Sequence, residues 1–78
     1  MKKSALFYDY VSGEIIEGPS DIIATEARER KNEDYKDKNL VLGRDFIENH
    51  TCYYLRETTR ELSRLDFERD IHNYLTRD

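Results

Sequence analysis

The sequence is short of the residues that crosslink a chain or break its regular structure. Its 78 residues include one cysteine, one proline, three glycines and no tryptophan. The lone Cys52 cannot form a disulfide within the chain, which fits a reducing compartment. No apolar run approaches the roughly 20 residues that a membrane-spanning helix needs. We therefore expect a cytoplasmic protein without a membrane anchor.

Apolar residues are also scarce, at 37% hydrophobic against 38% charged. A chain of this length buries only about 60% of the surface that its unfolded form exposes. We therefore expect one small domain over residues 1–78, with a thin core and a net stability of a few kcal/mol. Association with a partner or a second copy is a common remedy at this size.

Motifs for catalysis or for metal and nucleotide binding are absent from the sequence. The two histidines, His50 and His72, have no cysteine or histidine at ligand spacing, which argues against a zinc site. The glycines form no phosphate-binding loop. His50 and Cys52 would share a face of a strand, but no cation beside Cys52 lowers its pKa, so we interpret it as a buried thiol. The sequence predicts neither an enzyme nor a cofactor.

The first elements form a β-hairpin. Residues 5–11 alternate along a strand rich in aromatic types, with Leu6, Tyr8 and Tyr10 on one face and Phe7, Asp9 and Val11 on the other. Residues 12–13 supply a glycine-containing turn, and residues 14–17 return as the second strand. A hairpin alone is marginal in water, so further elements must cover it.

A helix over residues 21–31 follows, with Ser20 as its N-cap. Its apolar face is predicted to consist of Ile22, Ile23 and Ala27. Residues 32–39 are almost wholly polar, which predicts a mobile loop with an exposed Tyr35. Short strands are predicted at residues 40–42 and 51–56, with Gly43 ending the first.

The best helix candidate begins near Thr58, where Thr58 and Glu61 fit a capping box, and runs to Leu75. Its apolar residues change side part-way along. At 100° per residue, one group lies nearly opposite the other. The first group comprises Leu55, Leu62 and Leu65, and the second comprises Phe67, Ile71, Tyr74 and Leu75.

Two structures explain this change of side. We favour a continuous helix with two apolar faces, one of which needs a cover from outside the chain. That model predicts a homodimer through Phe67, Ile71 and Tyr74. In the other model the helix breaks near Ser63, which forms its own capping box with Asp66, and Leu62 packs on Phe67. Either way, the order is β-hairpin, helix, one or two short strands and C-terminal amphipathic helix, which is a small single-domain α+β fold.

Charge is unevenly distributed along the chain, whose net charge is −4. Between Ser4 and Ala27 there is no lysine or arginine, but there are five carboxylates. Such a surface repels nucleic acid and attracts basic protein faces. We therefore hypothesise an acidic interaction protein that docks on the basic surface of another protein and modulates or inhibits it. The candidate contacts are Tyr8, Tyr10, Glu14, Glu17 and Asp21.

Small acidic chains without motifs are typical of phage and mobile-element inhibitors of host nucleic-acid-processing or defence proteins.

An alternative function rests on Arg56, Arg60 and Arg64, which are spaced four residues apart and would line one side of a helix. Arginines near a helix N-terminus can hold a phosphate. This spacing predicts a nucleotide, phosphate or nucleic-acid-binding module. Interleaved acids such as Glu57 and Glu68 oppose it, because they can pair with these arginines.

Overall fold

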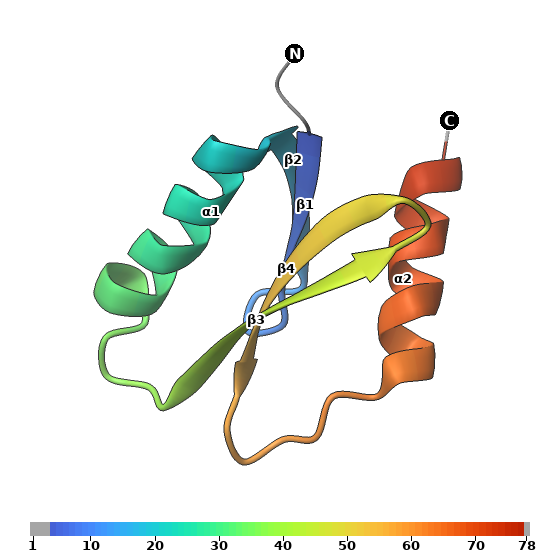
Figure 1. Cartoon of the computed structure of the whole chain (residues 1–78). Coiled ribbons are helices and arrows are strands. Elements are labelled where there is room, and N and C mark those ends of the chain that lie inside the picture. The colour runs from blue at the N-terminus through green and yellow to red at the C-terminus, as the bar shows by residue number, and fades with distance from the viewer. Residues whose placement is uncertain (1–3, 78) are drawn as a thin grey trace.

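The computed structural model describes residues 4–77 as a mixed four-stranded sheet with a helix on each face (Figure 1). In chain order the elements are β1 (Ser4–Asp9), β2 (Glu14–Pro19), α1 (Ser20–Glu29), the π-helical turn η1 (Arg30–Asp34), β3 (Leu40–Ile47), β4 (His50–Glu57) and α2 (Arg64–Thr76). The predicted α+β class and order of elements are therefore confirmed.

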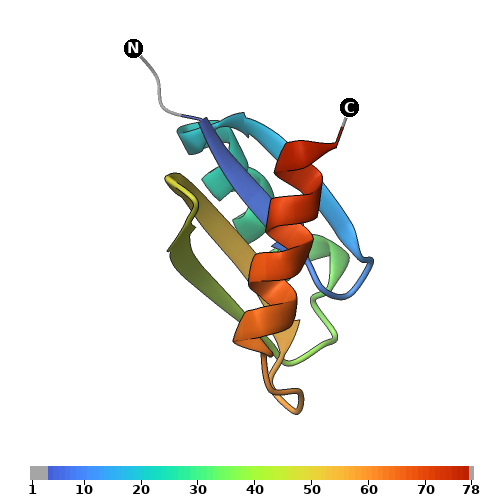
Figure 2. The same ribbon diagram turned by 90° about the vertical axis from the view of Figure 1, so that its right-hand side faces the viewer.

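The sheet joins two hairpins side by side, in the order β2-β1-β4-β3. Within each hairpin the strands are antiparallel, but β1 and β4 pair in parallel at the centre. Ala5 lies opposite Thr51 and Tyr8 opposite Tyr54. Strands β2 and β3 are left as the two edges, and Figure 2 shows β3 as the outermost strand on its side.

Each face of the sheet has its own core under its own helix. Because successive strand side chains point to opposite faces, β1 supplies both cores, as its alternation predicted. The buried residues under α1 are Ala5, Phe7, Ile23, Ala27, Leu40 and Leu55. Those under α2 are Leu6, Ile47, Cys52, Phe67 and Ile71. The helices therefore cover opposite faces, and Figure 2 shows α2 lying lengthwise over one of them.

The N-terminal hairpin forms as predicted, with different ends. β1 stops at Asp9 rather than residue 11, because the Asp9 carboxylate accepts hydrogen bonds from the backbone N–H of Val11 and Ser12 and so begins the turn. Gly13 completes the turn with a φ of 82°, a conformation that side chains disfavour. β2 runs on to Pro19, which an edge strand tolerates.

The first helix differs from its prediction at both ends. It begins at Ser20 without a side-chain cap, and beyond Glu29 the chain continues as the π-helical turn η1. The predicted polar loop over residues 32–39 is thus partly helical. Tyr35 is half-buried against the α1 core, so the prediction of an exposed Tyr35 is wrong. Ile22 was also wrongly placed in the core, since 57% of it is exposed.

Gly43 does not end the third strand, because β3 continues through it to Ile47. A Cβ atom at Gly43 would overlap the ring of Tyr54, the residue opposite it on β4. The missing side chain therefore gives the Tyr54 ring its place, where it meets Phe67 edge-on with 5.4 Å between the ring centroids. After Ile47 the chain turns at Glu48 and Asn49, both with positive φ.

The favoured continuous C-terminal helix is wrong, and the broken form is correct. Helix α2 begins at Arg64, and the Ser63 hydroxyl accepts a hydrogen bond of 3.3 Å from the backbone N–H of Asp66. Leu62 precedes the helix and packs on the same core as Phe67. Of the first apolar group, Leu55 belongs to β4 and Leu62 to the segment before α2, and the chain turns after Leu62 so that one core takes both Leu62 and Phe67. Leu65 remains 78% exposed.

Two further expectations concern burial and membranes. Cys52 is fully buried, as predicted, and this burial raises the pKa of its thiol to about 11. Over residues 4–77, neither helix is long and apolar enough to cross a membrane.

Candidate functional site

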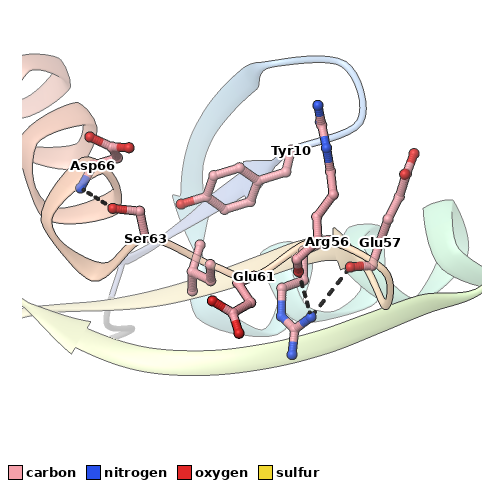
Figure 3. A pocket seen from close by; sticks show the side chains of 8 residues that line it. Tyr10, Arg56, Glu57, Glu61, Ser63 and Asp66 are labelled. Carbon is pink, nitrogen blue, oxygen red and sulfur yellow. Dashed lines mark hydrogen bonds between the residues drawn. The ribbon is translucent and has the colours of Figure 1, made fainter.

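A hollow of about 340 Å³ lies beside the first turn of α2 (Figure 3). The turn after β1, the end of β4 and the segment leading into α2 all contribute to it. Its lining residues are Tyr10, Arg56, Glu57, Arg60, Glu61, Leu62, Ser63 and Asp66. It has a mixed lining, with two cations, three carboxylates and an apolar and aromatic part.

Tyr10 forms the aromatic part of this hollow. Its ring stacks on Tyr8 with 4.0 Å between centroids and meets Phe67 edge-on at 6.0 Å. Its hydroxyl lies on the side of Ser63 and Asp66 in Figure 3, is shut off from solvent, and has no hydrogen-bond partner among residues 4–77. Burial raises the pKa of this hydroxyl, and the nearby Tyr8 and Asp70 add to the shift, so the phenol stays neutral. An unpaired buried hydroxyl destabilises the fold by about 1–3 kcal/mol.

The hydroxyl of the neighbouring Tyr8, in contrast, has a hydrogen-bond partner. Its hydroxyl donates a hydrogen bond of 2.6 Å to the Asp70 carboxylate on α2. Burial, followed by this hydrogen bond, raises the pKa of Tyr8 to about 12. Tyr8 therefore ties β1 to α2 rather than facing a partner.

The three arginines predicted to hold a phosphate are divided by the fold. Arg56 donates through Nη1 to the backbone carbonyls of Glu57 (3.3 Å) and Arg60 (3.0 Å), which braces the turn after β4. Arg64 lies outside the hollow, paired with Asp45 and Glu68. Only Arg56 and Arg60 meet in the hollow, and the carboxylates around them weaken its attraction for an anion.

On the other face of the sheet, a buried carboxylate holds the hairpin to the first helix. Asp9 is fully buried, with Oδ1 accepting from the N–H groups of Val11 (2.9 Å) and Ser12 (3.2 Å). Its Oδ2 accepts from Arg30 Nη1 (2.9 Å) and the Tyr35 hydroxyl (2.7 Å). Burial by itself would raise the pKa of Asp9, but these donors outweigh it and hold the pKa below its ordinary value.

Arg30 is the centre of this network, because it also pairs with Glu14 and Glu26 at 2.7 Å each. Three of the five carboxylates predicted to form an acidic surface are therefore neutralised by one arginine. Sequence reasoning missed the network, although a carboxylate at an inward position of β1 was the available signal. The network is structural in character, since its atoms are satisfied by one another.

The five predicted partner contacts do not share a surface. Tyr8 and Tyr10 pack under α2, and Glu14 pairs with Arg30 on the other face. Glu17 and Asp21 are exposed, as a contact residue must be.

The predicted dimer contacts are not available either. Phe67 and Ile71 are both 0% exposed inside the chain's own core, and Tyr74 is half-buried beside them. A second subunit could not reach Phe67 or Ile71 without opening the sheet from α2. The reason is the break at Ser63, which lets this side of the helix face the sheet.

A second surface, on the outer side of α1, was not predicted. Ile22 lies there in a shallow hollow of about 340 Å³, lined also by Asp21, Thr25, Glu26 and Glu29. These five residues, here called the α1 surface, combine an exposed apolar side chain with three carboxylates. The sequence pattern missed it because Ile22 and Ile23 are neighbours, and only Ile23 turns inward.

The described part of the chain contains no cluster of side chains that could bind a metal ion. Over residues 4–77, no three His, Cys, Asp or Glu side chains converge as a metal site requires. No family model, curated protein or solved structure matches the chain significantly. Its function must therefore be inferred from the geometry of its own surfaces.

Proposed function

We propose that this protein is a small acidic interaction protein that docks on the basic surface of another protein and modulates or inhibits it. The observation that carries the proposal is the α1 surface, where an exposed isoleucine is bordered by carboxylates. Protein interfaces combine an apolar anchor with a polar rim, and complementary charge selects the partner.

The charges of the α1 surface favour a basic partner. Within residues 4–77, no lysine or arginine lines its hollow. Asp21 and Glu29, two of its three carboxylates, are exposed and would face the partner's cations. Ile22 would fill an apolar depression between the partner's lysines or arginines, and its burial would contribute about 1–2 kcal/mol.

The partner that we propose is a host nucleic-acid-processing or defence protein, and the source a phage or mobile element. Proteins that bind nucleic acid carry basic surfaces, because they neutralise phosphates with lysine and arginine. An acidic surface of this kind would compete with nucleic acid for such a face.

The test is quantitative affinity capture from the native cell, with wild type, Ile22→Arg and Leu65→Arg as baits. Leu65 is the control, since it is also a large exposed apolar residue but lies on α2, over the other face of the sheet. We expect a basic protein captured by wild type and Leu65→Arg and lost with Ile22→Arg. Equal capture by all three baits, or the absence of any enriched protein, would reject the α1 surface as the docking site.

A second candidate function is nucleotide or phosphate binding in the hollow beside α2, because Arg56 and Arg60 meet there next to Tyr10. Titration with nucleotides and short oligonucleotides at two salt concentrations tests it. Binding through phosphates must weaken steeply with salt. The three lining carboxylates make this the less favoured candidate.

A further inference from the structure

Strand β3 is an open edge of the sheet. Its other side is paired with β4 from Leu40 to Ile47, and no strand of the described chain lies outside it. An edge strand presents unpaired N–H and C=O groups and can accept another strand.

The groups turned outward can be identified. The two-residue turn at Glu48 and Asn49 closes the hairpin on the pair Ile47–His50. In a hairpin with a two-residue turn, the closing pair exchanges backbone hydrogen bonds and the next pair, Phe46–Thr51, does not. The backbone N–H and C=O groups of Phe46, and of every second residue before it on β3, therefore point away from β4 toward the open edge. The backbone N–H of Phe46 agrees with this, since it donates to the Asp45 carboxylate at 2.8 Å instead of to β4.

On the face of the sheet that α1 covers, this end of β3 is left open. α1 packs over β1, β2 and β4, and its core takes Leu40 and Leu42 from β3 but not the residues that follow. Phe46 is 61% exposed, and Arg44, two residues before it on the same face, is exposed as well. With Asp45 and Thr51, they line a hollow of about 390 Å³.

The opposite edge is better protected against pairing. β2 carries Glu14 and Glu17 on its two faces and ends at Pro19, which cannot donate to a new ladder. On β3 the acidic residue Asp45 is paired with Arg64, and the free edge shows an arginine next to an aromatic ring.

We propose that two copies of the chain pair antiparallel through their β3 strands, with Arg44 of each copy beside the partner's Phe46. A twofold axis perpendicular to the sheet relates the copies and keeps equivalent faces together, so one edge meets itself. A guanidinium over an aromatic ring is an attractive contact, and the symmetry makes it twice.

A second copy is the occupant that the chemistry of the edge favours. The edge carries both halves of the contact, a cation and an aromatic ring, alternating on the α1 face, so this face is complementary to its own twofold copy. On the α2 face the same register places Asp45 opposite the partner's Asp45, and each of these carboxylates is paired with Arg64 of its own chain. Pairing joins two sheets into one of eight strands and covers Phe46. The site is independent of the proposed docking of the α1 surface, which stays exposed on each copy.

The test is sedimentation velocity from about 10 µM to 1 mM, with wild type, Phe46→Ala, Phe46→Tyr and the control Leu65→Ala. We expect wild type, Phe46→Tyr and Leu65→Ala to dimerise alike. Because both aromatic contacts are lost together, we expect Phe46→Ala to dissociate about tenfold more readily. Circular dichroism of each variant establishes that the fold is retained.

Mixed samples of isotope-labelled and unlabelled chains locate the contact. Intermolecular nuclear Overhauser effects between the two copies' Arg44 and Phe46 would confirm the pairing. A wild type that stays monomeric at 1 mM, or a Phe46→Ala variant that dimerises as well as Leu65→Ala, would overturn it. So would intermolecular contacts at another surface.

Discussion

The buried carboxylate of Asp9 allows a sharp test of how burial changes the strength of an ion pair. Arg30 pairs with Asp9, which is fully buried, and with Glu14, whose side chain is 51% exposed. The two pairs share one guanidinium and have similar distances of 2.9 and 2.7 Å. Replacing each acid with its amide therefore compares the same loss of charge in two environments.

The expected effects differ severalfold. In Asp9→Asn, the amide oxygen can still accept from Val11 and Ser12, but the amide nitrogen cannot accept the hydrogen bond of the Tyr35 hydroxyl or the charge-assisted hydrogen bond of Arg30. The loss of this charge-assisted hydrogen bond destabilises the fold by about 2–3 kcal/mol. In Glu14→Gln, a solvent-exposed pair is lost, for which we expect less than about 1 kcal/mol. Against the total stability of a few kcal/mol expected for this chain, both changes are measurable.

Urea unfolding followed by circular dichroism provides the assay, because the free energy of unfolding falls linearly with urea. The two variants are compared with wild type at pH 7. An unchanged slope of the unfolding free energy against urea concentration shows that the unfolded state is not altered. Equal losses in Asp9→Asn and Glu14→Gln would refute the reasoning, since burial would then make no difference.

The pH dependence gives the same network a second readout. The donors around Asp9 keep its pKa in the folded protein below the ordinary value of 3.8. A depressed carboxyl pKa means that the stabilisation is fully present above the unfolded value and is lost as the pH falls through the folded value. The difference between wild type and Asp9→Asn should therefore be constant from pH 5 to 7 and shrink below about pH 4.

Three further substitutions test other parts of the structure by the same unfolding assay. Ser63→Ala removes the cap of α2 and should destabilise by about 1 kcal/mol; no change would mean that the helix start does not depend on it. Gly43→Ala should destabilise by about 1–3 kcal/mol, because the new methyl group displaces the Tyr54 ring, and an unchanged midpoint would contradict that packing. Tyr10→Phe removes an unpaired buried hydroxyl and should stabilise by about 1 kcal/mol, whereas a loss of stability would show that the hydroxyl has a partner.

Local patterns predicted the elements that depend on local chemistry. The alternation of residues 5–11 placed Phe7 and Tyr8 on opposite faces, because a strand has a period of two in any fold. The capping box at Ser63 was also visible, but so was another at Thr58. The choice between them depended on where the sheet lies, which no local pattern records.

The predictions that were wrong failed for the same reason, because they depended on contacts between residues distant in the sequence. Tyr35 lies in a polar stretch, and its burial depends on partners distant in the sequence, namely Asp9, 26 positions away, and the α1 core against which it packs. Gly43 is typical of the end of a strand, but here it lies within β3, where its missing side chain makes room for the ring of Tyr54 on the neighbouring strand. The candidate sites were harder still, since the hollow beside α2 depends on where the chain breaks before that helix, and the α1 surface depends on which of Ile22 and Ile23 turns inward.

The parallel pairing of β1 with β4 has a consequence for how the protein is made. The partner strand of β1 emerges from the ribosome only after α1, η1 and β3 have been synthesised, and without it the first hairpin has no neighbour on its inner side. Two-stranded hairpins are marginal in water. The nascent chain should therefore remain protease-sensitive until β4 is available and then acquire its sheet in a single late step.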